Sequence, residues 1–557
     1  MMTTTQETFN LVDRPWIRVR ALDGGERLLS GREVFEQSRT IERIAGESPQ
    51  QDAAVLRVLL AAWWSAVREE PQLSDGDARA AGEWWIDQFT STDVPGGRVA
   101  MDRYWNAVRG RWDLLDPVAP FMQVSDLHTA KGEWSSVRKL LPDAESSYFT
   151  LREGDAAESL ALDEAARWLV HLQAWNYSGI KSGAVGDPRV KGGRGYPIGT
   201  GWSGKAGVVV LHGRDLAETL LLNTPPTKVF LNDVETDRPV WEREPDMAAS
   251  RGVEAPAGPR DLLTWQIRRV RLRIEDGRVT GAVVSNGDRI ELKNQFADPM
   301  TAYRHSIPQS KKAGTDVWMP REHSESRTLW RGVEPLLLRE GMASSSSRDR
   351  PPATTADLSG LHQELRVADV EDVLIGVEMI GTVYGTQDAV VTSTIREELP
   401  LRLAALTSQD PDVADTIVTA AKQTMDAAVD LGRLAGNLAV AAGGEYSFVA
   451  AATEAALAGL TEPFKGWLAR VGPDADLQVL RDQWFASADR HLRAHGARLV
   501  AGAGPVAVVG REDADGRLHS AATAWGSFTY AIDKTLDGPA RRRRNAPADT
   551  RDETVST

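Results

Sequence analysis

Ten glycines fall within residues 178–207, and this density limits what the middle of the chain can fold into. Glycine loses more backbone freedom on ordering than any other residue, so the sequence predicts neither a helix nor a buried strand here. Such a segment is typical of a loop whose backbone comes very close to something else. It carries five Lys or Arg residues and one acid, Asp187. The cations favour nucleic-acid phosphate or nucleotide phosphate as the ligand, and a flexible surface loop is the alternative.

The C-terminal part of the chain has a different character, because alanine and leucine recur there at helical spacing. Four such segments, most on short connections, predict an antiparallel four-helix bundle within residues 401–537; they are 410–443, 457–471, 476–494 and 521–536. We expect residues 538–557 to form a disordered tail. The arginine run 541–544 could touch phosphate, but a solvated tail is the commoner fate of such a run.

Residues 1–400 follow no single pattern and predict an irregular mixed α/β region. Its expected elements are an edge strand at 9–19, helices at 52–67, 78–89 and 162–175, a strand at 207–211 and a hairpin at 268–292. Periodicity fades over 125–154, which suggests a mobile loop carrying two aromatic residues, Tyr148 and Phe149. The predicted fold class is therefore α+β, with this mixed α/β region followed by the helical bundle.

Charge restricts how the chain could meet nucleic acid. A net charge of −14 and a pI near 5.3 argue against a protein that coats nucleic acid by bulk attraction. Any such contact must be local, or a partner must supply much of the positive field. The 18 tryptophans favour core packing over base stacking, because burial is the commoner fate of this side chain.

The composition also bears on compartment. No secretion signal and no run of about 20 apolar residues is visible, so neither export nor a membrane span is expected. Cysteine is absent, which rules out disulfides and thiolate metal sites and is typical of a protein of the reducing cytoplasm.

Motifs for catalysis are missing. The glycine segment lacks the order of a phosphate-binding Walker loop, and GTGWSG at 199–204 is followed by the strand-like VVVL where a dinucleotide-binding fold needs a helix. The only histidine pair at helical spacing, His491 and His495, has no third metal ligand, so we assign it a structural role. The sequence predicts no enzyme activity, no metal and no cofactor.

Five segments together resemble one known family. They are FNLVDRPWIRVR at the start, APFMQ at 119–123, the glycine segment, GRDLAETLLLNT at 213–224 and GTVYGTQDAVV at 381–391. In this order, with a terminal helical bundle, they resemble the large-subunit (CasA) family of the type I-E CRISPR surveillance complex, Cascade. The resemblance implies a non-catalytic subunit that recognises the protospacer-adjacent motif in double-stranded DNA. It further implies help in opening the duplex for CRISPR RNA pairing, contacts with other Cascade subunits, and recruitment of a helicase-nuclease.

The resemblance also suggests which residues read DNA. It implies a glycine loop, a wedge that parts the strands below the motif, a lysine finger and an aromatic contact to the guide RNA. The positions that match are Gly179, Lys181, Ser182 and Gly183 for the loop, with Gly192, Gly193 and Gly195 as competitors and their neighbours Lys191 and Arg194 as further DNA contacts; Thr386, Gln387, Asp388 and Ala389 for the wedge; Lys293 for the finger; and Phe149 for the RNA contact.

Two features depart from the family's pattern. Asp388 would place a carboxylate near phosphates that repel it, which leaves two roles open: Asp388 accepts a hydrogen bond from a base amine, or Thr386 and Gln387 do the inserting. The four-cysteine zinc ribbon of some members has no counterpart here. Two other interpretations stay open at this point. One is an enzyme that binds a nucleotide in the glycine segment, and the other is a scaffold subunit that does not read DNA.

Overall fold

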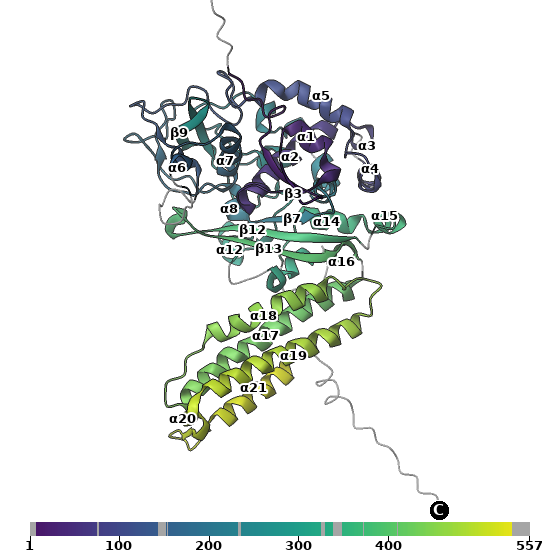
Figure 1. Cartoon of the computed structure of the whole chain (residues 1–557), viewed down its shortest axis with the longest axis vertical. Coiled ribbons are helices and arrows are strands. Elements are labelled where there is room, and N and C mark those ends of the chain that lie inside the picture. The colour runs from purple at the N-terminus through teal and green to yellow at the C-terminus, as the bar shows by residue number, and fades with distance from the viewer. Residues whose placement is uncertain are drawn as a thin grey trace, which may run out of the picture. The chain divides into compact units, whose positions relative to one another are not determined.

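A computed structural model describes residues 7–74, 77–142, 152, 154–231, 235–324, 329–337, 348–370, 373–408 and 410–536. The chain divides into two compact units. The first comprises Met1–Thr328 and Pro335–Leu399, and the second comprises Leu329–Glu334 and Pro400–Thr557. The first unit contains both helices and small antiparallel sheets (Figure 1), which confirms the mixed α/β class.

Helix α2 (Pro49–Val67) is the centre of the first unit. It begins at Ser48, whose side chain accepts a hydrogen bond from the Gln51 amide, and nearly all of its residues are buried. Its tryptophans tie it to distant parts of the chain, since Trp63 donates to the Pro95 carbonyl and Trp64 to the Thr224 hydroxyl. Most of the chain's tryptophans are buried in this way, so their prediction as core anchors is confirmed.

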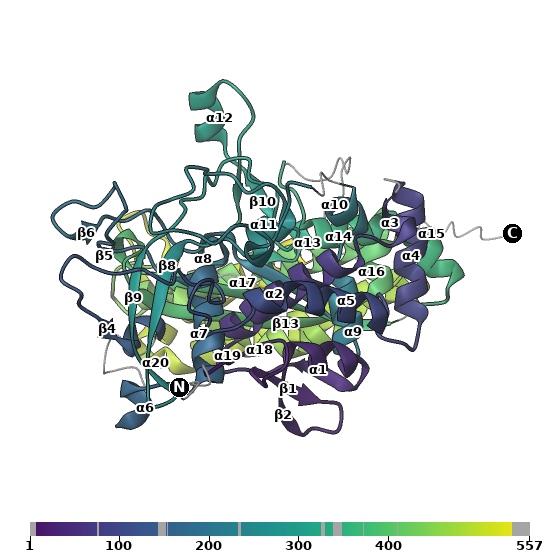
Figure 2. The ribbon, with the colours of Figure 1, turned by 90° about the horizontal axis from the view of Figure 1, so that it is seen from above.

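The other helices of this unit are mostly short. They are α1 (Gly31–Glu36), α3 (Pro71–Ser74), α4 (Ala78–Thr90), α5 (Arg98–Val108), α6 (Asp155–Glu158), α7 (Leu162–Trp175), α8 (Trp202–Ala206), α9 (Leu216–Leu222), α10 (Pro226–Phe230), α11 (Pro259–Leu263), α12 (Ile307–Ala313), α14 (Ala353–Gly360) and α15 (His362–Val367). Helix α13 (Glu334–Leu337) spans the boundary between the units, because Glu334 belongs to the second unit and the residues after it belong to the first. The expected helices at 52–67, 78–89 and 162–175 are thus confirmed as α2, α4 and α7. Figure 2 shows α12 standing out beyond the strand β10 (Tyr303–His305). Strand β10 pairs with β11 (Trp318–Pro320), and α12 connects the two in the chain.

Three antiparallel sheets, each of three strands, organise the unit. The first has the order β2 (Glu26–Leu29), β1 (Ile17–Ala21), β3 (Ile41–Ile44), so the expected edge strand is wrong: β1 starts after Pro15 and is central. The second has the order β13 (Val391–Arg402), β12 (Leu374–Tyr384), β7 (Val208–His212). The third has the order β4 (Ser135–Ser136), β9 (Arg278–Asn286), β8 (Arg268–Glu275).

The β8–β9 pair confirms the predicted hairpin. Its turn lies at Asp276 and Gly277, which both have positive φ, as a two-residue type I′ connection requires. Strand β4 pairs with the same β9, and it belongs to the segment that we expected to be a mobile loop. The mobility of this segment stays a prediction, but its fading periodicity did not predict β4 or the following 3-10 turn (Val137–Leu140). Residues 143–151 and 153 lie outside the described residues.

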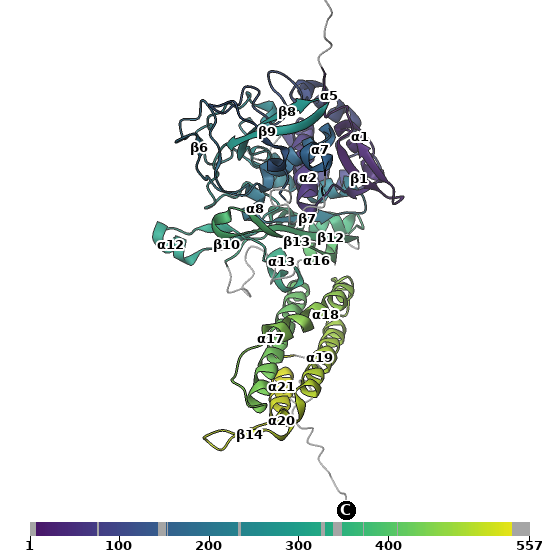
Figure 3. The ribbon, with the colours of Figure 1, turned by 60° about the vertical axis from the view of Figure 1, so that its left-hand side comes forward.

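The second unit is helical. Helix α17 (Pro411–Ala441) packs against α18 (Ala450–Leu468), α19 (Leu477–Gly502) and α21 (Ala521–Thr535), and these helices run side by side (Figure 3). Shorter elements complete the unit: α16 (Leu403–Thr407), α20 (Gly504–Val509), β14 (Arg511–Glu512) and β15 (Leu518–His519). The segment 329–334 also belongs here, because Trp330 is fully buried and stacks on Phe464 at 4.9 Å between ring centroids. No local pattern in the sequence predicts this insertion. No helix within the described ranges is long and apolar enough to cross a membrane.

Candidate nucleic-acid interface

One buried arginine holds together the two ends of the loop that the glycine segment forms. These ends, at Tyr177 and Gly199, are called the neck. Arg268, at the start of β8, is 1% exposed and donates to the carbonyls of Tyr177 and Gly199, each at 2.8 Å. Its Nε also donates to the Asn176 side chain at 2.8 Å. Burial lowers the pKa of the Arg268 guanidinium to about 9, so the group stays cationic at neutral pH. Residues 177 and 199 are thereby fixed side by side, and the chain between them forms a closed loop.

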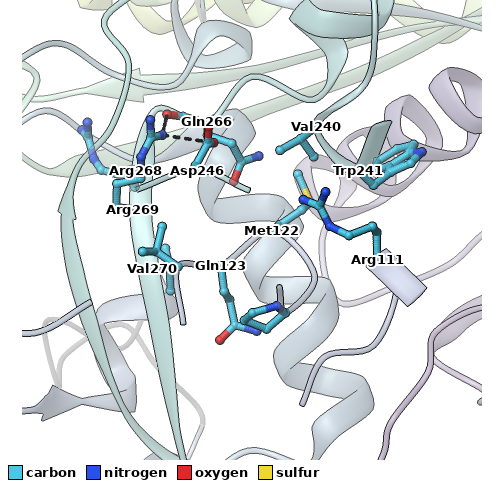
Figure 4. Close-up of a pocket in the computed structure, with 12 residues that line it drawn as sticks. Arg111, Met122, Gln123, Val240, Trp241, Asp246, Gln266, Arg268, Arg269 and Val270 are labelled. Carbon is cyan, nitrogen blue, oxygen red and sulfur yellow. Dashed lines mark hydrogen bonds and ion pairs between the residues drawn. The ribbon is translucent and has the colours of Figure 1, made fainter. Parts of the chain in front are cut away.

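A second arginine, Arg269, anchors the neighbouring wall. In Figure 4 it lies on one side of a small pocket with Asp246 and Gln266, and Met122, Val240 and Arg111 lie on the other side. Arg269 donates to the Gln266 carbonyl at 3.1 Å and lies 3.4 Å from a carboxylate oxygen of Asp246. Strand β8 therefore has both Arg268 and Arg269 buried, and together they make it a rigid base for the loop.

Within the loop, the two glycine clusters lie on paired strands. Strand β5 (Lys181–Ser182) pairs with β6 (Arg194–Gly195), and the Gly183 amide donates to the Gly193 carbonyl at 3.1 Å. A Cβ on Gly183 would lie 2.6 Å from the Gly193 carbonyl, so a side chain does not fit there. From the sequence alone the two clusters are competitors for one role, whereas the structure brings them together.

The far end of this pair is a tight turn. Lys191 and Arg194 exchange both backbone hydrogen bonds at 3.1 Å around Gly192 and Gly193, whose φ values are +57° and +73°. Two successive positive φ angles define a type I′ turn, which explains the two glycines. All four residues are exposed, so the turn presents two cations to solvent on a fixed backbone.

Lys181 and Ser182 are placed differently from the turn. Lys181 is only 8% exposed, and its ammonium lies 3.5 Å from the centre of the Tyr177 ring. Such a cation–π contact stabilises a lysine that has lost most of its water. Ser182 is half-buried beside it. These residues support the base of the loop, and its exposed charge lies at the turn.

The end of the glycine segment corrects one expectation. Residues 202–206 form helix α8, although the sequence predicts no helix between 178 and 207. The glycines here serve close packing instead. A Cβ on Gly201 would lie 2.3 Å from the Ala174 carbonyl, and one on Gly204 would lie 2.0 Å from the Tyr384 hydroxyl. Tyr384 donates to the Trp175 carbonyl at 2.6 Å, and burial raises the pKa of its phenol, so it remains a donor.

The wedge candidates form the tip of the β12–β13 hairpin. Thr386–Asp388 make a single 3-10 turn, closed by a hydrogen bond from the Gly385 amide to the Val390 carbonyl at 2.9 Å. Gln387 and Asp388 have φ values of +59° and +55°. Left-handed backbone costs a non-glycine residue about 1–2 kcal/mol, so this tip is strained. Thr386, Gln387 and Ala389 are exposed, and the Gln387 side-chain amide has no hydrogen-bond partner among the described residues.

The hairpin tip and the glycine segment touch. The Ser178 amide donates to the Asp388 carbonyl at 2.7 Å, and the Lys205 ammonium on α8 lies 3.0 Å from the Asp388 carboxylate. The space in front of Gly179 is bordered by Ala389, whose carbonyl would lie 3.8 Å from an added Cβ. Two stretches that are far apart in sequence therefore build one surface, named here the composite tip: residues 178–195 and 385–390.

Two candidates are not brought into the composite tip. Lys293 is exposed beside β11, where the adjacent Asn294 exchanges hydrogen bonds of 2.9 and 2.8 Å with the backbone of Trp318. Over the described ranges, no hydrogen bond or ion pair joins Lys293 to the glycine segment or the hairpin tip. Phe149 lies outside the described residues. No group of three or more metal-ligating side chains occurs in the part of the chain that the structure describes.

Sequence reasoning misses the residues that hold this surface together. Arg268 and Lys205 make its central contacts, yet neither is a candidate site residue from the sequence. An arginine at a strand start is ordinarily exposed, so nothing in the sequence around Arg268 indicates a buried clamp. Lys205 is one of the cations of the glycine segment, but its partner Asp388 is too distant in sequence to be paired with it.

Comparison with known proteins gives consistent matches over most of the chain. The family model described as CRISPR-associated protein Cse1 matches residues 10–497. The crystal structure of Thermobifida fusca Cse1 is 35% identical, with a TM-score of 0.83 over 96% of this chain and 99% of that chain. CRISPR-associated protein CasA/Cse1 from Thermus thermophilus is 29% identical over 453 residues, which is 79% of each protein. A chain of a CRISPR RNA-guided surveillance complex, 17% identical, shares the fold with a TM-score of 0.64 over 88% of this chain and 99% of that chain.

Proposed function

The chain belongs to the CRISPR-associated Cse1 (CasA) family, and we propose that its composite tip recognises the protospacer-adjacent motif in double-stranded DNA. In this proposal the protein is a non-catalytic subunit of Cascade that reads the motif and begins strand separation. CRISPR RNA pairing then reads the rest of the target, as in other RNA-guided systems. The observation that carries the proposal is the contact between Ser178 and Asp388, because it joins the glycine loop to the wedge.

The chemistry of the two halves suits a minor-groove sensor. The minor groove offers few distinguishing groups, so close backbone approach and a small number of polar contacts are what a reader needs there. Gly192 and Gly193 allow such an approach, and Lys191 and Arg194 flank them as phosphate contacts. Lys181, being buried, supports the loop in this scheme, and Lys293 stays a more distant candidate for a lysine finger.

The wedge half would act on base stacking. Gln387 is exposed at a strained, tethered tip and has an unused amide, so inserting it into a base step requires no rearrangement of its hairpin. Insertion of a side chain unstacks a base step at a cost of a few kcal/mol. The bent duplex then contacts more protein surface, and these contacts offset the cost. Thr386 and Ala389 are the exposed neighbours that would line the gap.

The second unit would serve assembly. We propose that α17, α18, α19 and α21 form a four-helix bundle that contacts other Cascade subunits and helps to recruit the helicase-nuclease. In the same proposal the chain works in the cytoplasm together with CRISPR RNA, and Phe149 contacts that RNA.

The test is duplex binding by the reconstituted complex with and without this subunit. We expect the subunit to add affinity for motif-bearing duplexes over scrambled ones at one fixed salt concentration. Equal binding to both duplexes would favour the scaffold interpretation. Mg²⁺-dependent hydrolysis of a nucleotide by the isolated chain would instead favour the enzyme interpretation.

Removal of either cation from the turn at residues 191–194 should weaken DNA binding. Lys191→Ala and Arg194→Ala should each weaken binding to motif-bearing and scrambled duplexes alike, because phosphate contacts carry no sequence information. Each should also reduce the slope of log Kd against log salt by about one. The measurement is a salt titration of the reconstituted complex. Arg79→Ala on α4, exposed and paired with Glu83, is the matched control and should leave the slope unchanged. An unaltered slope in both turn variants would show that the turn does not face phosphate.

A further inference from the structure

Asp388 is the one acidic residue of the hairpin tip, and its charge opposes the proposed function. A carboxylate in a surface that meets DNA is repelled by phosphates, and the repulsion is strongest where water is excluded. Asp388 is also half-buried, with 34% of its side chain exposed, so solvent screens it only in part. The tip therefore needs a positive charge that stays next to Asp388 when the surface meets DNA.

Lys205 supplies that counter-charge from the glycine segment. Its ammonium lies 3.0 Å from each carboxylate oxygen of Asp388 and 3.6 Å from Glu322, which is 60% exposed. The Lys205 side chain is 22% exposed and comes from α8, a helix packed against β12. The Lys205 ammonium is closer to Asp388 than to Glu322, so Lys205 and Asp388 together carry almost no net charge. Glu322 lies on the solvent side of this pair.

The same pair holds the strained backbone. Both Gln387 and Asp388 are left-handed, and such a turn persists only where neighbouring contacts fix it. The Asp388 carbonyl is held by the Ser178 amide at 2.7 Å, and its carboxylate is held by Lys205. Asp388 is thus fixed by a hydrogen bond to its main chain and by an ion pair to its side chain. The residue before it, Gln387, is exposed at the tip.

We propose that Lys205 is a positioning residue for motif reading: it neutralises Asp388 and locks the hairpin tip onto the glycine segment. This inference rests on the proposed function. It also explains how the wedge tolerates an acid, since the DNA would meet an ion pair in place of a free carboxylate. Lys205 acts through Asp388 and makes no contact with DNA itself.

The experiment is a double-mutant cycle on the reconstituted complex. Lys205→Met leaves Asp388 unpaired and should lower the preference for motif-bearing over scrambled duplex by about tenfold, which is a loss of about 1.4 kcal/mol. Asp388→Asn removes the charge and should lower it by no more than about threefold. The double variant should recover most of the Lys205→Met loss, because a neutral amide needs no counter-charge. Lys205→Arg should behave like the original chain. Any loss of affinity for scrambled duplex in Lys205→Met should disappear in the double variant, because that loss comes from the unpaired carboxylate of Asp388 repelling phosphate.

The outcomes separate this inference from the function beneath it. If the original complex shows no motif preference, the proposed function fails before the cycle begins. If the preference exists but the two losses simply add, or the double variant recovers nothing, Lys205 acts independently of Asp388 and the inference is wrong. A lower affinity for scrambled duplex that persists in the double variant would also overturn it, because that would mark Lys205 as a direct phosphate contact. Thermal denaturation of each variant checks that the pair is not needed for folding.

Discussion

Replacing Arg268 by methionine should open the neck of the glycine segment and abolish motif recognition. Methionine fills similar space but donates no hydrogen bond, so the carbonyls of Tyr177 and Gly199 and the side chain of Asn176 lose their buried partner. Each buried group left unpaired costs about 1–3 kcal/mol, so we expect a loss of about 3–5 kcal/mol from the stability of the first unit. Denaturation followed by tryptophan fluorescence, with limited proteolysis of residues 178–198, measures both effects.

The matched control lies on the same strand. Arg271 is half-buried, makes one long hydrogen bond of 3.4 Å to the Leu127 carbonyl and rests 5.4 Å from the Trp134 ring. Arg271→Met should cost less than about 1 kcal/mol, because its donors remain hydrated. Equal stability and equal protease resistance in Arg268→Met and the original chain would contradict the clamp.

Gly183→Ala should separate the two paired strands of the loop. The added Cβ would lie 2.6 Å from the Gly193 carbonyl carbon and oxygen, which are backbone atoms that cannot rotate away. Overpacking of this kind costs about 1–3 kcal/mol, here concentrated in the loop. We therefore expect motif preference to fall by about tenfold or more, since that factor corresponds to about 1.4 kcal/mol. Motif-bearing and scrambled duplexes bound by the reconstituted complex provide the measurement.

Gly192→Asn is the control for that experiment. Residue 192 has φ +57° and open space around its Cβ position, and asparagine followed by glycine is a favoured type I′ turn. The substitution should keep the strands paired and leave the stability of the loop within about 0.5 kcal/mol. Because the proposal places Gly192 against the DNA, this comparison is made on protease resistance of residues 178–198 and not on DNA binding. If Gly192→Asn loosens the loop as much as Gly183→Ala does, the close contact of Gly183 with Gly193 is not the cause.

Much of the fold follows from local patterns. Helices α2, α4 and α7 and the β8–β9 hairpin were predictable because apolar periodicity and the Asp276-Gly277 turn act over a few residues. The density of glycine also predicted a loop with close backbone contacts. Which glycines serve turns and which serve packing was not predictable, because Gly183 and Gly201 meet residues brought near by the fold.

Long-range contacts are what the sequence could not supply. Lys205 and Asp388 are 183 positions apart, and Trp330 reaches the helical unit from a segment that precedes β12. Such pairings depend on the path of the whole chain, since many other acids and cations would satisfy the same local chemistry. The resemblance to a family located the glycine segment and the wedge separately, and the structure adds that they touch.

The most direct test of the composite tip is strand opening next to the motif, followed with a fluorescent base analogue in the duplex. Gln387→Ala removes the exposed amide while leaving the turn and its tethers, Ser178 and Lys205, in place. The reconstituted complex with this variant should still bind motif-bearing duplex within about threefold, yet open it at least about tenfold more slowly. Opening at the original rate by the Gln387→Ala complex would contradict the assignment of the hairpin tip as the wedge.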